Sequence, residues 1–149
     1  MKKIVFVLLA LLIMCGSAMA GSTLDGFLNN LNIQARADIN GFSAKLSTQF
    51  GIPELQVRAV IGSVREPADA FMSLQLGQWT QKPVEQVVRV YQANQGKGWG
   101  VIAKRMGIKP GSAEFHALKS GNLTFSGHPV GEQDERPGTS KGRGKGHNK

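Results

Sequence analysis

The fold class is decided by residues 24–50, which read LDGFLNNLNIQARADINGFSAKLSTQF. Apolar side chains recur there at steps of three and four residues, the spacing of one face of an α-helix: Leu24, Phe27, Leu28, Leu31, Ala35, Ile39, Phe42, Leu46 and Phe50. Gly26 and Gly41 each cost about 1 kcal/mol relative to alanine inside a helix. We therefore expect one short and one longer helix with a break near Asn32, and a left-handed C-cap at Gly51.

Three prolines further along mark the starts of more helices: Pro53, Pro67 and Pro83. Proline suits the first helical position, because its missing N–H needs no partner there. An acid follows each proline within two residues, where the helix dipole favours negative charge: Glu54, Asp69 and Glu85. The β-branched residues 87–91 also fit a strand, but the segment's length and polar ending favour a helix closed by Gly96.

Two shorter helices are expected after this point. Residues 99–106 have helical apolar spacing and stop at Gly107. Ser112 is a good N-cap, and Glu114 favours the first turn of the helix that follows. The sequence therefore predicts one small all-α domain of five to seven short helices over residues 21–120.

The first twenty residues have the three parts of a secretory signal peptide. Lys2 and Lys3 supply the positive start, residues 4–15 the apolar run, and Ala18-Met19-Ala20 a small-residue cleavage site. The apolar run is shorter than the roughly 20 residues of a membrane span. No second apolar stretch of that length follows, so we expect cleavage before Gly21 and no transmembrane segment in the mature chain.

Cleavage would leave sixteen basic and ten acidic side chains, a net charge of +6, and no cysteine. The mature protein could then form neither a disulfide nor a thiolate site. The periplasm is the favoured destination and secretion the alternative. A lipoprotein acylated at Cys15 is disfavoured, because that signal requires a small residue where Met14 stands.

The last 29 residues, 121–149, differ in composition from the rest of the chain. They hold seven glycines, two prolines and few large apolar side chains. Such a segment buries too little apolar surface to offset the lost backbone entropy. We expect a disordered tail that ends in a glycine-spaced basic arm: Lys141, Arg143, Lys145 and Lys149.

The sequence holds no catalytic or metal-binding motif. His116 and Glu114 lie two residues apart, so they project to different sides of a helix and cannot chelate one ion. No serine lies in a nucleophile elbow, and residues 96–100 lack the spacing of a phosphate-binding loop. We therefore predict no enzyme activity, no cofactor and no metal.

A candidate binding surface lies between Gly96 and Gly121. Residues 102–112 resemble the helix-turn-helix of repressor-type proteins, but export and the apolar Phe115 in the second helix argue against sequence-specific DNA binding. We expect Trp99 to be a buried anchor, with an exposed stacking platform as the alternative. The predicted surface comprises Lys97, Trp99, Lys104, Arg105, Lys109, His116 and Lys119.

Four short stretches resemble a group of small exported bacterial proteins of unknown function: EPADA at 66–70, GWGVIA at 98–103, GIKPGS at 107–112 and EFHALK at 114–119. The last three are parts of a shared segment, GWGxIAxxxGIKPGSxEFHALK. The resemblance covers residues 66–121 and implies an exported helical domain, often with a low-complexity tail. It carries no catalytic or ligand-binding residue over to this chain.

These observations favour an exported, non-enzymatic helical protein that acts by binding a partner, such as an envelope protein. The alternative is a basic polyanion-binding protein that uses the surface from Lys97 to Lys119 and the C-terminal arm. Its ligand would be nucleic acid, anionic lipid or an envelope polymer. A hydrolase would require His116 to meet an acid and a serine in one cleft.

Overall fold

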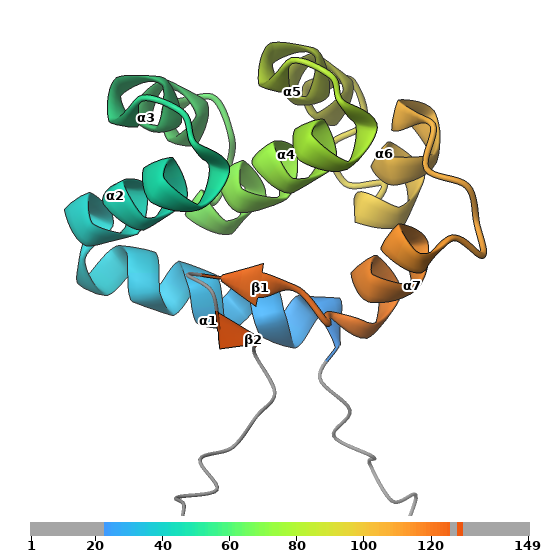
Figure 1. The fold of residues 1–149 in the computed structure, drawn as a ribbon, viewed down its shortest axis with the longest axis horizontal. Helices are drawn as coiled ribbons and strands as arrows, with labels where there is room; N and C mark the ends of the chain where they lie inside the picture. The colour runs from blue at the N-terminus through green and yellow to red at the C-terminus, as the bar shows by residue number, and fades with distance from the viewer. Residues whose placement is uncertain (1–22, 126–127, 130–149) are drawn as a thin grey trace, which may run out of the picture.

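The computed structural model describes residues 23–125 and 128–129 (Figure 1). Seven helices make up most of this part of the chain: α1 (Leu24–Ala37), α2 (Ile39–Phe50), α3 (Glu54–Gly62), α4 (Pro67–Thr80), α5 (Val84–Ala93), α6 (Trp99–Met106) and α7 (Ala113–Ser120). Two short strands follow, β1 (Thr124–Phe125) and β2 (His128–Pro129). The predicted all-α fold is confirmed. None of the described helices has the length and apolarity needed to span a bilayer.

The central element is α4, around which the other helices are arranged (Figure 1). Residues 68–77 of α4 are buried with a single exception, Asp69, which is half-buried. A helix that is apolar on all sides is typical of the interior of a domain. Helices α1, α2, α3, α5 and α6 all contact α4. The core is therefore one cluster built around this helix.

The break between the first two helices lies at Asp38, so the prediction of a break near Asn32 was wrong. The Asp38 carboxylate accepts a hydrogen bond from the backbone N–H of Gly41 at 2.9 Å and so caps α2. Asn32 lies inside α1, and its Oδ1 accepts from the Ala68 N–H at 2.9 Å. That contact joins α1 to the start of α4.

The predicted helix ends are mostly confirmed, with shifts of a few residues. Pro67 is the first residue of α4, as expected, whereas Pro53 and Pro83 stand one position earlier, as N-caps. Gly51 has a φ of 65° and forms the left-handed cap of α2. Residues 87–91 are helical, but α5 ends at Ala93, before the predicted stop at Gly96.

The predicted boundary of the domain at residue 120 falls too early. Leu123 and Phe125 are buried in the core, and the Phe125 ring packs 5.3 Å from that of Phe42. β1 pairs antiparallel with β2, with Phe125 opposite His128. Residues 121–125 thus belong to the domain, while the predicted signal peptide (1–20) and the tail from 130 onward lie outside the described residues.

Candidate functional site

The predicted surface lies on α6, α7 and the loops beside them, and these two helices lie together at one end of the molecule, opposite α2 and α3 (Figure 1). Their bounds agree with the predicted helices, including the left-handed cap at Gly107 and the Ser112 N-cap. Ser112 Oγ accepts from the N–H of Phe115 at 3.2 Å. The two helices meet where Gly100 faces the Phe115 ring, since a Cβ at Gly100 would lie 4.0 Å from Phe115 Cζ.

Both helices are anchored to the rest of the domain. Lys82 Nζ donates a hydrogen bond to the carbonyl of Met106 at 2.9 Å and so satisfies a free group at the C-terminal end of α6. At the end of α7, Gly121 approaches the backbone of Thr23 so closely that a Cβ there would lie 2.7 Å from the Thr23 carbonyl oxygen. The α6–α7 end is therefore held by contacts to α1 and to the loop between α4 and α5.

Trp99 is a buried anchor, as the sequence favoured, and the alternative of an exposed stacking platform was wrong. Its side chain is 7% exposed and its ring stacks on Tyr91, with the centroids 5.3 Å apart. The indole Nε1 donates to Asp69 Oδ1 at 3.3 Å. Trp99 therefore packs beneath the predicted surface, with one face of its ring covered by Tyr91.

Asp69 joins three helices through its carboxylate. Oδ2 accepts from the Tyr91 hydroxyl at 2.7 Å and from the Glu66 N–H at 3.2 Å, while Oδ1 accepts from Trp99. The Tyr91 hydroxyl in turn accepts from the N–H of Arg65 at 3.3 Å. Burial, followed by the hydrogen bond to Asp69, raises the pKa of Tyr91 to about 12.

This hydrogen-bonded group lies beside a depression of about 360 Å³, which Trp99 and Tyr91 help to line. Sequence reasoning missed the group, because the position of Asp69 in the first turn of α4 already explained that residue. It could have been predicted from a general rule: a buried tyrosine hydroxyl and a buried indole N–H each need a hydrogen-bond acceptor. The two stretches EPADA and GWGVIA are thereby joined by the Trp99–Asp69 hydrogen bond.

The five basic residues of the predicted surface are all exposed: Lys97, Lys104, Arg105, Lys109 and Lys119. The ion pairs among residues 23–125 are Arg36–Glu66 and Arg58–Glu54, so none of the five bases is neutralised by one. His116 is exposed on the same side of α7 as Lys119, three residues away. Lys109 lines a depression of about 310 Å³ that Trp99 does not line. The predicted residues thus share one end of the molecule without converging on one pocket.

A third depression, of about 600 Å³ and so larger than the other two, contains none of the predicted residues. It lies between the end of α2, α4 and the start of α5, with Phe50, Leu74 and Val84 among its apolar lining residues. Gln56 Nε2 donates to Glu85 Oε1 at 2.9 Å and links α3 to α5 beside it. Its polar side chains are three glutamines, Lys82, which donates to the Met106 carbonyl, and Glu85, which accepts from Gln56; this gives no set of groups arranged for a reaction.

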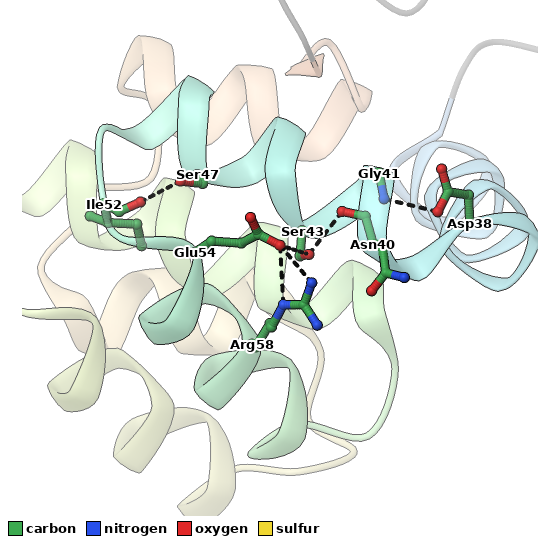
Figure 2. Close-up of polar contacts among 8 residues, drawn as sticks. All are labelled: Asp38, Asn40, Gly41, Ser43, Ser47, Ile52, Glu54 and Arg58. Carbon is green, nitrogen blue, oxygen red and sulfur yellow. Dashed lines mark hydrogen bonds and ion pairs between the residues drawn. The ribbon is translucent and has the colours of Figure 1, made fainter.

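A serine–carboxylate pair lies between α2 and α3 (Figure 2). The buried Ser43 Oγ lies within hydrogen-bond distance of the Asn40 carbonyl, at 2.9 Å, and of Glu54 Oε1, at 3.1 Å. Arg58 donates to the same Glu54 oxygen, and these hydrogen bonds, that from Arg58 first, lower the pKa of Glu54. The cluster connects the two helices and contains no histidine that could activate the serine.

The side-chain trio required for a hydrolase is not assembled among the described residues. In this part of the chain, no hydrogen bond joins the His116 side chain to an acid or a serine, and no three His, Cys, Asp or Glu residues are grouped as metal ligands. The comparisons add no further constraint: no protein-family model, curated protein or solved structure matches the chain. The site is therefore interpreted from its own geometry and charge.

Proposed function

We propose that this chain is an exported, non-enzymatic helical protein that acts by binding a partner, with the α6–α7 end as its binding surface. The buried sides of the two helices attach them to α1, α4 and α5, while their outer sides carry exposed charged residues. Because the helices of this surface are already fixed, they lose little conformational entropy when a partner binds, and this favours affinity.

The observation that carries the proposal is the uneven distribution of charge along the described fold. Residues 23–96 hold six basic and six acidic side chains and so have no net charge. Residues 97–119 hold five basic side chains against a single acid, Glu114. The net positive charge of the described domain is thus concentrated at the α6–α7 end.

This charge favours a second, more specific candidate, a polyanion-binding protein. Exposed bases that are free of ion pairs can neutralise ligand charges without first losing an internal partner. Helix stabilisation is the competing explanation, since Lys104, Arg105 and Lys119 lie in the last turns of their helices, where the dipole favours cations. That effect does not account for Lys97 and Lys109, which lie outside the helices.

The test compares the mature chain, residues 21–149, with two double variants of equal charge loss. K104Q/R105Q removes two bases from the α6–α7 end, whereas R36Q/R58Q removes two that are already paired with Glu66 and Glu54. Heparin serves as the probe, and binding is measured by calorimetry at about 50 and 200 mM salt. We expect affinity to fall with salt and to fall further in K104Q/R105Q than in R36Q/R58Q.

Two results would count against the proposal: heparin binding that does not respond to salt, or equal losses in both variants. Thermal unfolding of each variant checks that the fold is retained. Export is tested separately by sequencing the N-terminus of the protein recovered from the periplasm or the medium. The proposed cleavage predicts Gly21 as the first residue, and a chain that begins at Met1 contradicts it.

A further inference from the structure

The outer side of α7 is a narrow helix face that no other described residue covers. Ala113, His116, Lys119 and Ser120 are exposed there, while Leu118 is buried on the opposite side. The helix has eight residues, which corresponds to a length of about 12 Å and a diameter of roughly 10–12 Å. The major groove of duplex DNA is about 12 Å wide and accepts one helix of this size.

From this face and the charges around it, we propose that the α6–α7 end binds double-stranded DNA through its phosphate backbone, without reading the base sequence. The inference rests on the proposed function and specifies the polyanion. Lys104 and Arg105 extend from the outer side of α6, and Lys109 lies in the connection between the helices. A helix that lies in a groove and has basic side chains on its flanks can contact phosphates on both sides of that groove.

The connection between α6 and α7 supports the comparison with a helix-turn-helix. It spans residues 107–112 and contains two left-handed glycines, Gly107 with a φ of 100° and Gly111 with a φ of 91°. Glycine adopts this conformation without the steric penalty of a side chain. The two glycines therefore let the chain turn between the helices, and α7 packs beside α6.

The composition of α7 argues against base readout. The commonest base contacts come from arginine, lysine, asparagine and glutamine, and of these α7 (AEFHALKS) contains a single lysine. Its lysine, Lys119, lies in the last turn, whereas recognition helices contact bases mainly through N-terminal residues. Glu114 and Phe115 near the N-terminus are half-buried. The face can occupy a groove without distinguishing sequences.

The exposed side chains also separate a duplex from other polyanions. Single strands are bound by stacking bases on exposed aromatic rings, and bilayers by inserting apolar side chains. At the α6–α7 end Trp99 is buried and Phe115 half-buried. The large exposed apolar residues in the described chain are on α1, α2 and α3 instead: Ile33, Ile39 and Leu55. The α6–α7 end therefore presents positive charge and an exposed helix face, which match the phosphates and the groove of a duplex.

The experiment measures binding of the mature chain to labelled 20-base-pair duplexes of two unrelated sequences, by fluorescence anisotropy. The competitors are the single strand of the same sequence, heparin and anionic lipid vesicles. We expect the duplex to bind more tightly than the single strand and the vesicles, and the two sequences to differ by less than about threefold, because phosphate contacts carry no sequence information. If Lys104 and Arg105 both contact phosphates, the slope of the logarithm of the binding constant against the logarithm of the salt concentration should become about 1.8 units shallower in K104Q/R105Q.

A second pair of variants tests α7 itself. A113E places a carboxylate on the exposed face of α7, and A59E places one at an exposed position on α3, at the other end of the molecule. An acid in the first turn of α7 does not weaken that helix, so A113E should fold. A like charge about 4 Å from a phosphate should weaken duplex binding by about fivefold in A113E, with little change in A59E.

The outcomes distinguish the inference from the proposed function. If heparin binding depends on Lys104 and Arg105 but the single strand or vesicles bind as well as the duplex, the proposed function stands and the inference fails. Equal effects of A113E and A59E, or strong discrimination between the two duplexes, also overturn the inference. If neither heparin nor the duplex binds, the polyanion candidate fails together with the inference.

Discussion

Substitution of Gly121 by alanine tests how the α6–α7 end is attached to α1. Gly121 has a φ of 69°, and its Cβ would lie 2.7 Å from both the carbonyl carbon and oxygen of Thr23 and 2.9 Å from the Leu24 nitrogen. The left-handed conformation costs alanine about 1–2 kcal/mol. The clash is with backbone atoms, which cannot rotate away, and forced overpacking adds about 1–3 kcal/mol. We expect G121A to lower the free energy of unfolding by about 2–5 kcal/mol, the sum of these two costs.

Gly51 provides the matched control. It caps α2 with a φ of 65°, nearly that of Gly121, but a Cβ there would have no atom within 4 Å. G51A therefore carries only the conformational cost of about 1–2 kcal/mol. Both variants are compared by urea unfolding. The amide exchange of α1 is a second readout, because Thr23 Oγ1 also caps that helix by accepting from the Gly26 N–H. Equal losses of stability in the two variants would refute the close approach of α7 to α1.

Substitutions at three further positions, Tyr91, Trp99 and Ser112, test the contacts that hold α6 and α7. The raised pKa of Tyr91 means that its neutral phenol stabilises the folded protein fully below pH 10, and that this stabilisation is lost as the pH rises from 10 to about 12. When the free energy of unfolding is measured across this range, Y91F should lack this alkaline loss of about 2–3 kcal/mol. W99L removes the ring stacked on Tyr91 and the donor to Asp69, so urea unfolding should show a loss of about 2–4 kcal/mol, with W99F losing about half as much. S112A removes the N-cap of α7 and should lower the free energy of unfolding by about 1 kcal/mol. Relative to the unsubstituted protein, amide exchange should become faster in α7 but not in α5, and unchanged exchange in α7 would contradict the cap.

Local sequence signals predicted the helices of this fold well. The start and end of α6 and the N-cap of α7 depend on neighbouring residues, such as the left-handed Gly107 and the hydroxyl of Ser112, and these were located correctly. The first break was misplaced because two features compete within residues 24–50. Gly26 weakens a helix, yet Asp38 begins the next one by capping the N–H of Gly41, and the cap decides the boundary.

The C-terminal boundary of the domain could not be found from composition. Residues 121–125 are only a small part of a glycine-rich segment, so an average over 29 residues conceals Leu123 and Phe125. The Phe125 ring lies 6.1 Å from that of Phe71 and 5.3 Å from that of Phe42, on two different helices. Its burial depends on a gap that only the assembled helices create. A few apolar residues can thus extend a domain when such a gap is available.

The basic surface shows which part of a site a sequence can predict. Five basic residues within 23 positions are visible in the sequence, and the exposure of the three in helices, Lys104, Arg105 and Lys119, follows from the apolar spacing of α6 and α7. The orientation of that surface was not visible, because Asp69 binds Tyr91 and Trp99 across 22 and 30 residues of sequence. A carboxylate in a first turn already has a local explanation, so nothing in the local pattern indicates its distant partners. The charge of this end is therefore set by residues 97–119 themselves, whereas the direction in which it faces depends on an acid in α4.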